Sequence, residues 1–277
     1  MNELIYTRPQ DFELEHNGES DDIDFFVNLV SRLKPKRAIE LACGSGRLTF
    51  PLAEVAARQK FHLVGLDKSN EMLSAARQTY EGIPLEQRQW VTLKQGDMRS
   101  WTDEEPFDLI LIIDGSASHL LNLDDQVCTW RQAYNNLAAG GHFVVDVAMP
   151  WMTAYTDSFQ TPGRTLVEID RDTTDPATGD RLIRYKTIRY AAQEQRAEVR
   201  FLYNRFSSGT LTDHYISDFE CHVFFPRELQ LLFLYTGFTV EAIYGDYRGR
   251  GLHHRSEQMI VVGTKPEGIT SKGKPGK

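Results

Sequence analysis

The feature that most constrains this chain is an alternation of short apolar segments with helical segments between residues 37 and 149. Five segments have the length and apolar composition of buried strands, at 37–43, 61–67, 90–97, 107–114 and 141–149. Helical patterns separate them at 47–58, 70–79 and 124–137, and another precedes them at 23–33. Buried strands spaced by helices predict an α/β fold with a doubly wound, mostly parallel sheet.

The pattern changes after Pro150. Between residues 164 and 225, alternating runs are broken at 175–180, 191–195 and 207–210, which predicts an antiparallel β insertion of about four strands after the fifth strand. A helix at 226–238 and strands at 239–245 and 258–264 then complete a seven-stranded sheet. The predicted organisation is an N-terminal segment (1–20), a core domain (21–150 and 226–264), the insertion (151–225) and a disordered tail (265–277).

Composition limits the partners. The net charge is −8 and no dense Lys/Arg run precedes the tail, so no nucleic-acid partner is expected. No segment approaches the roughly 18 consecutive apolar residues of a membrane span, so we expect no membrane partner and a cytoplasmic location. The three cysteines are far apart and are expected to be reduced, and no metal site is predicted. A homodimer is possible, and the sequence leaves the oligomeric state open.

The stretch "ELACGSGRLTF" (40–50) places two glycines between a strand and a helix, where a backbone comes close to a ligand. A dinucleotide-binding turn has a third small residue, and the corresponding positions here are Gly44, Gly46 and Thr49. The β-branched Thr49 therefore argues against NAD. The Gly-Lys-Ser/Thr ending of a phosphate-binding loop is absent.

Acids follow the next three strands. Asp67 stands where a carboxylate can accept both hydroxyls of a ribose, and Asp97, beside Met98, can accept from an exocyclic adenine amine. Asp114 ends the fourth strand. Open α/β sheets bind ligands at the carboxyl ends of their strands, so these residues predict one nucleoside-binding crevice.

These residues resemble the class I S-adenosylmethionine-dependent methyltransferases. The resemblance rests on "ELACGSGR", "GLDKSNEMLSAAR", "QGDM", "FDLILIIDGSASHLL" and "LAAGGHFVVDV", and it covers about 23–149 and 226–264. The β insertion and the C-terminal strands are similar to a small-molecule branch that includes amino-sugar N,N-dimethyltransferases and glycine N-methyltransferase-like enzymes. The resemblance implies S-adenosyl-L-methionine as cofactor and the following cofactor-binding residues: Tyr6, Glu40, Ala42, Gly44, Gly46, Arg47, Asp67, Lys68, Met72, Asp97, Met98, Asp114 and Gly115.

Two of these residues raise further expectations. Arg47 opens a predicted helix, where a cation opposes the positive end of the helix dipole, so we expect a partner for it. That partner is either the methionyl carboxylate or an acid from the N-terminal segment. Tyr6 lies in a segment that folds over the cofactor in similar enzymes, as does His16.

The catalytic candidates are His119, Tyr215 and His222. His119 follows the fourth strand, where an imidazole could take a proton from an ammonium acceptor, or could simply be a helix histidine bonded to backbone. Tyr215 and His222 lie on opposite faces of one predicted insertion strand. One face should cover the active site, and the sequence leaves open which face it is.

The sequence therefore predicts methyl transfer to a small-molecule acceptor, with an amine nitrogen favoured. The insertion is expected to form the acceptor lid and to contribute little to cofactor binding. The alternatives are O- or C-methylation of a natural product and, from other classes, an NAD-dependent oxidoreductase or a non-catalytic cofactor-binding protein.

Overall fold

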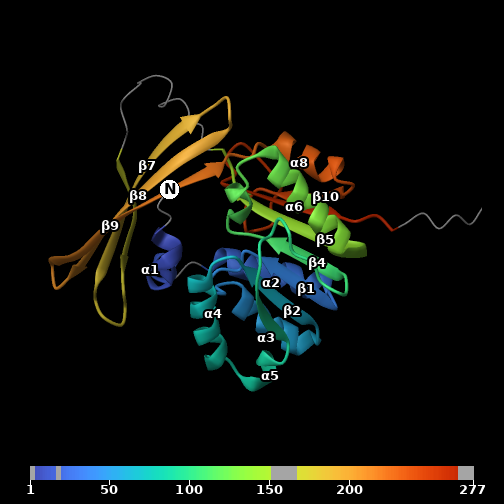
Figure 1. The fold of residues 1–277 in the computed structure, drawn as a ribbon, viewed down its shortest axis with the longest axis horizontal. Coiled ribbons are helices and arrows are strands. Elements are labelled where there is room, and N and C mark those ends of the chain that lie inside the picture. Colours follow the sequence, from blue (N-terminus) through green and yellow to red (C-terminus); the bar gives the residue numbers. More distant parts are fainter. Residues whose placement is uncertain (1–3, 17–19, 151–166, 268–277) are drawn as a thin grey trace, which may run out of the picture.

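The computed structural model describes residues 4–16, 20–150 and 167–267, and Figure 1 shows two sheets in them. The central sheet has seven strands in the order β10-β11-β5-β4-β1-β2-β3. The strands β1 to β5 are parallel, and β11 and β10 are antiparallel additions beside β5. Their bounds are β1 Arg37–Leu41, β2 His62–Asp67, β3 Val91–Gln95, β4 Phe107–Ile112, β5 Leu137–Ala148, β10 Thr239–Tyr244 and β11 Gln258–Thr264.

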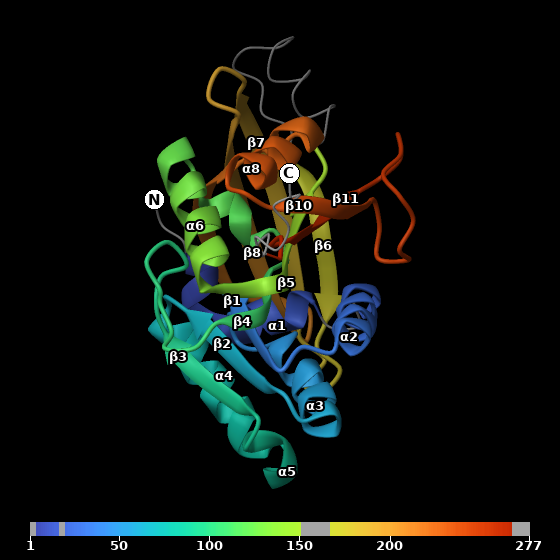
Figure 2. The same ribbon diagram turned by 90° about the vertical axis from the view of Figure 1, so that its right-hand side faces the viewer.

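Helices cover both faces of this sheet, with α6 on one side and α2 and α3 on the other (Figure 2). Two buried clusters fill the layers: Trp130 of α6 and Phe233 of α8 pack on one face, and Phe26 of α2 and Leu52 of α3 pack on the other. The predicted doubly wound α/β fold is confirmed. The helices and short turns are α2 Asp21–Leu33, α3 Thr49–Gln59, α4 Asn70–Gly82, α5 Leu85–Arg88, η2 Ser116–His119, α6 Leu123–Asn136 and α8 Pro226–Tyr235.

The second sheet is the predicted insertion, a four-stranded antiparallel meander in the order β6-β7-β8-β9. Its strands are β6 Glu168–Thr174, β7 Arg181–Ala191, β8 Arg196–Ser207 and β9 Thr210–His222. The turns between them fall where the sequence predicted them. The first part of the predicted insertion, 151–166, lies outside the described residues.

The N-terminal segment forms a short turn, η1 Leu4–Thr7, and a helix, α1 Pro9–Glu15. In Figure 1, α1 lies between the second sheet and α4 at the edge of the central sheet. It contacts both α4 and β6. The N-terminal segment thus contacts both the second sheet and a helix of the central domain.

The tail prediction requires a correction at its start. Lys265 is ordered, because its backbone N–H donates to the Gly141 carbonyl (2.9 Å) and its ammonium donates to the carbonyls of Tyr134 and Leu137. The predicted disorder of 268–277 concerns residues that the structure does not describe. Within the described ranges, no helix combines the length and the apolar character that crossing a membrane requires.

Candidate active site

A cavity of about 660 Å³ lies at the carboxyl ends of β1, β2, β3 and β4. This volume falls within the usual range of small-molecule sites. The N-terminal segment forms another part of the wall through Tyr6, Thr7 and Phe12. Among the described lining residues are twelve predicted from the sequence: Tyr6, Glu40, Ala42, Gly44, Arg47, Asp67, Lys68, Met72, Asp97, Met98, Asp114 and His119.

The turn after β1 forms the floor of the cavity. Ala42 and Gly44 adopt positive φ angles of 60° and 56°, a conformation that glycine tolerates best. The Gly44 N–H donates to Asp67 Oδ2 over 2.8 Å, which ties this turn to the end of β2. A Cβ on Gly44 would stand 3.2 Å from Met72 Cε, so a side chain here would crowd the wall.

The second glycine of the turn, Gly46, has different surroundings from Gly44. It is not among the described residues that line the cavity. Its φ is +90°, and a Cβ built on it would lie 2.2 Å from Cε2 of Phe50. The contact that a side chain at Gly46 would meet within the protein is thus with the first turn of α3. The predicted Gly115 is also absent from the described lining, and its N–H donates to the Asp146 carbonyl (3.2 Å).

Thr49, which disfavoured a dinucleotide turn, has a specific partner. Its hydroxyl donates to Glu40 Oε2 over 2.5 Å, and both residues are buried. Burial raises the pKa of Glu40 to about 7, and the hydrogen bond from Thr49 opposes that rise. Thr49, at the third position of the glycine motif, thus forms a hydrogen bond to a buried acid that lines the cavity.

Asp67 is 8% exposed and accepts two backbone hydrogen bonds, from Gly44 and from Ser69 (2.8 Å each). Ser69, rather than Asp67, caps α4, because its hydroxyl accepts from the Met72 N–H. A carboxylate has about four lone-pair sites. Asp67 can therefore still accept hydroxyl groups from a ligand.

Asp97 lies in the wall and forms an ion pair with Arg99, whose guanidinium donates to it at 2.6 Å. This hydrogen bond lowers the pKa of Asp97 below its usual value, so the carboxylate is charged at neutral pH. Arg99 also donates to Asp125 (3.1 Å). Part of the acceptor capacity predicted for an adenine amine is thus already used by Arg99.

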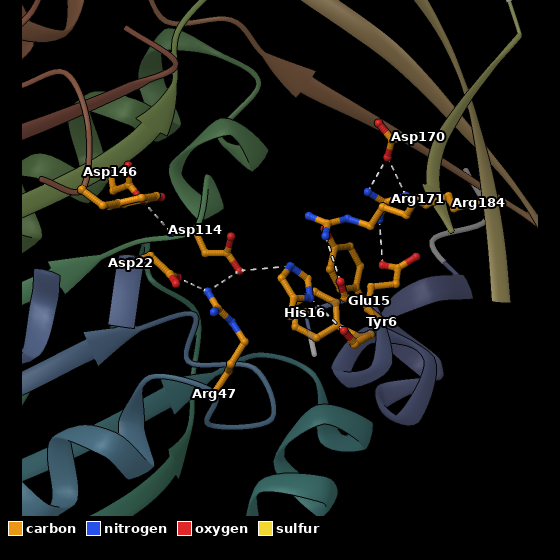
Figure 3. A network of polar contacts seen from close by, with 12 residues as sticks. Tyr6, Glu15, His16, Asp22, Arg47, Asp114, Asp146, Asp170, Arg171 and Arg184 are labelled. Atoms are coloured by element: carbon orange, nitrogen blue, oxygen red, sulfur yellow. Dashed lines mark hydrogen bonds and ion pairs between the residues drawn. The ribbon is translucent and has the colours of Figure 1, made fainter. Parts of the chain in front are cut away.

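Arg47 has two acidic partners, and neither lies in the N-terminal segment (1–20) where an acid was predicted. Helix α3 begins at Thr49, so Arg47 lies in the preceding turn. Its guanidinium forms an ion pair with Asp22 of α2 and lies 3.5 Å from Asp114 Oδ2 (Figure 3). His16 approaches the same Asp114 oxygen at 4.0 Å from the end of α1.

The sequence reasoning missed Asp146. It is 1% exposed near the end of β5 and accepts from Tyr247 (2.9 Å) and from the Asp114 N–H (3.3 Å). Burial raises its pKa to about 7, and the Tyr247 hydrogen bond opposes that rise. An acid inside the apolar run "VVDVA" was the available signal. Asp114, whose φ is +54°, is bonded to Asp146 through its backbone N–H.

Of the three catalytic candidates, only His119 reaches the cavity. It lies in η2, and its Nε2 is hydrogen-bonded to the Tyr6 hydroxyl at 2.7 Å. The Phe219 ring of β9 lies 6.0 Å from the imidazole, centroid to centroid. Three separate parts of the chain thus meet at His119.

Tyr215 and His222 require correction, because neither is among the described lining residues. Tyr215 stacks on Tyr203 and donates its hydroxyl to Asp11 of α1 over 2.8 Å. His222 is buried and bonded to Glu228 Oε1 (2.9 Å) at the start of α8. Both side chains are therefore fixed in structural contacts.

The structure also decides which face of β9 looks inward. Tyr215 and Ser217 are buried, whereas Ile216 is 42% exposed and His214 is exposed. Phe219 continues the inward face toward His119. The face that carries Tyr215, Ser217 and Phe219 therefore turns toward the N-terminal segment and η2.

Residues 38–141 match a family model described as "Methyltransferase domain". YqeM of Bacillus subtilis (strain 168), which is named as a methyltransferase, is 25% identical over 236 residues, or 85% of this chain and 86% of YqeM. The CcbJ methyltransferase structure from Streptomyces caelestis superimposes with a TM-score of 0.71 at 18% identity, covering 89% of this chain and 90% of CcbJ. The structure of SAM-bound CalS10, an amino pentose methyltransferase from Micromonospora echinaspora, gives 0.66 at 18% identity, covering 92% of this chain and 96% of CalS10.

Proposed function

We propose that this S-adenosylmethionine-dependent methyltransferase, which resembles class I enzymes that act on small molecules, has an amine nitrogen as its acceptor atom. The bound cofactor supplies a methyl group already activated on a sulfonium. The protein's own contribution is to hold the acceptor in line, exclude water and manage the acceptor's proton. The cavity suits these tasks, since it has the volume of a ligand site and wall residues from both the N-terminal segment and the ends of the parallel strands.

For the cofactor, we propose the assignment that the sequence predicted, with Gly46 and Gly115 removed. The backbone at Gly44 can come close to a ligand because this residue has no Cβ. A Cβ here would crowd the Met72 side chain. Asp67 accepts the ribose hydroxyls with its remaining lone pairs, and Asp97 and Met98 border the base. The support for this assignment is that Gly44, Asp67, Asp97 and Met98 share one wall.

The observation that carries the amine assignment is the Tyr6–His119 pair at the cavity wall. An amine is protonated at neutral pH and must lose that proton before its lone pair can attack a methyl group. His119 accepts the proton, and the Tyr6 hydroxyl orients the imidazole. Asp114, in the same wall, supplies a negative charge that attracts an ammonium ion.

We further propose that the insertion closes the acceptor side, as the sequence predicted. Phe219 lies beside His119, and Phe201 packs against Phe219 with ring centroids 5.2 Å apart. Aromatic rings that face a polar pair suit an acceptor with one apolar surface. CalS10 is named as an amino pentose methyltransferase, and an amino sugar carries a nitrogen of the kind proposed here.

The test is release of S-adenosylhomocysteine from a panel of amines, each matched with the alcohol of the same skeleton. We expect turnover with amines, and His119→Asn should lower kcat by at least about 100-fold. S-adenosylhomocysteine affinity should change less than about threefold, because the imidazole acts on the acceptor and the Asn side chain leaves a polar partner for Tyr6. His214→Asn is the matched control, since His214 is exposed on the other face of β9. Turnover restricted to the alcohols would refute the nitrogen assignment.

A further inference from the structure

Helix α1 is attached to the insertion sheet through a buried acid. Asp11 is 5% exposed, accepts from the Tyr215 hydroxyl (2.8 Å) and forms an ion pair with Arg205 of β8. Arg8, just before α1, donates to Asp213 at 2.6 Å, and its guanidinium lies 3.9 Å from the centre of the Tyr215 ring. A buried carboxylate is tolerated because it has these partners.

A second acid fixes the other end of α1. Glu15 is 3% exposed and pairs with Arg184 of β7 at 2.7 Å, and Arg184 is also paired with Asp170 of β6. The Glu15 carbonyl accepts from Arg171 over 2.8 Å. Figure 3 shows this group beside the sheet, on the side of His16 away from Arg47. All four strands of the insertion therefore contribute to holding α1 and its flanking residues.

Apolar packing accompanies these ion pairs. Leu14 of α1 forms a small buried cluster with Leu182, Tyr203 and Tyr215 of the insertion, and Phe12 packs against it. This cluster is separate from the two clusters of the central sheet. The apolar side of α1 therefore packs on the insertion sheet rather than on the central sheet.

The same segment forms part of the cofactor pocket. Tyr6, Thr7 and Phe12 line the cavity. The Ser69 hydroxyl, at the start of α4, donates to the Tyr6 carbonyl at 3.5 Å, and Tyr6 is bonded to His119. One face of the segment therefore touches the cofactor wall while the other is fixed to the insertion.

We propose that Asp11 and Glu15 are positioning residues that make cofactor affinity depend on the insertion. They hold α1 so that Tyr6 and Phe12 close the cofactor pocket, although neither acid lines it. Since the insertion also faces the acceptor, acceptor binding and cofactor binding are coupled through α1, and coupling between two binding equilibria is reciprocal. The acceptor side rests on the proposed function. The inference replaces the expectation that the insertion contributes little to cofactor binding.

The experiment measures the dissociation constant of S-adenosylhomocysteine by calorimetry, together with the melting temperature, for single variants of the full chain. We expect Asp11→Asn to weaken binding at least about tenfold, or about 1.4 kcal/mol. Tyr215→Phe keeps the ring and loses one hydrogen bond, so we expect a smaller loss in the same direction. Asp218→Asn is the matched control, because Asp218 pairs with Arg200 on the outward face of β9. It should bind within about twofold of the wild type.

A purely structural role would lower the melting temperature of Asp11→Asn and leave the affinity of the folded protein unchanged, and that result overturns the proposal. If Asp11→Asn does not fold, Tyr215→Phe gives the decision by the same criterion. A double variant with Arg205→Gln adds a check, since two residues of one clamp should show non-additive losses of affinity. These readouts need no acceptor. Failure of the amine assignment would appear only in the turnover assay.

Discussion

Asp146 is a carboxylic acid near the end of β5, and burial raises its pKa from 3.8 to about 7. Among the residues that the structure describes, the Tyr247 hydroxyl and the Asp114 N–H donate to its Oδ2, and none donates to its Oδ1. An ionised carboxylate in such a site costs free energy, so the folded state favours the protonated acid. At neutral pH this residue is close to its midpoint of titration.

Asp146→Asn is therefore expected to flatten the pH dependence of stability. A group whose pKa is raised on folding contributes stability that is fully present below its unfolded pKa and is lost as pH rises through the folded value. The wild type should lose about 4 kcal/mol through this group between about pH 4 and about pH 8. The amide mimics the neutral acid and lacks this loss. Denaturant unfolding across that range measures it, and parallel curves for the two proteins would contradict the assignment.

The turn before α3 is an element whose shape depends on glycine. Gly46 has a φ of +90°, and the Phe50 ring occupies the space that a side chain would need. The turn carries Gly44 to the cavity floor and Arg47 to Asp22. A change at Gly46 should thus act on the stability of the turn first and on the cofactor only through it.

Gly46→Ala is expected to destabilise the fold by about 1 to 2 kcal/mol through strain at positive φ, and by a further amount through the clash of its Cβ with the Phe50 ring. Adding Phe50→Leu should recover the steric part of this loss and leave the part due to φ. Gly82→Ala, at the end of α4, is the control: a Cβ there meets nothing within 4 Å, so its stability should be unchanged or slightly higher. Thermal unfolding gives the comparison. Lost cofactor binding at unchanged stability would restore the simpler ligand-contact role of Gly46.

At the scale of the molecule, negative charge exceeds positive charge, both in the whole chain and in the cavity wall. The chain has a net charge of −8. The described cavity wall carries the acids Glu40, Asp67, Glu71, Asp97 and Asp114 against the bases Arg47, Lys68 and Arg99. S-adenosylmethionine has one more positive charge than its demethylated product. The field of the protein should therefore favour the cofactor over the product.

Salt should reduce this preference. Raising ionic strength from about 0.01 M to about 1 M shortens the Debye length from about 30 Å to about 3 Å, so long-range attraction is screened. We expect the dissociation constant of S-adenosylmethionine to rise at least about twofold more than that of S-adenosylhomocysteine. Calorimetry at the two salt concentrations measures both constants. Equal salt dependence would show that the acidic field does not reach the sulfonium.

The strands and the order of site residues were readable from the sequence, because each depends on neighbours in the chain. Apolar runs of strand length gave β1 to β5, and the residues that follow parallel strands must meet at one edge. Asp67, Asp97 and Asp114 were found in this way, and all three line the cavity. His119 was found by the same rule.

The roles of Tyr215, His222 and Asp11 were decided by the tertiary structure. Alternation along β9 fixed which residues share a face, but both faces carry polar and aromatic side chains, so neither was marked as the inner one. The choice came from α1, whose Asp11 and Glu15 meet partners about 200 and 170 positions away in the sequence. The sequence by itself determined the sheet and its ligand edge, through local periodicity. Only long-range packing decided which side chains reach the cavity and which hold the two sheets together.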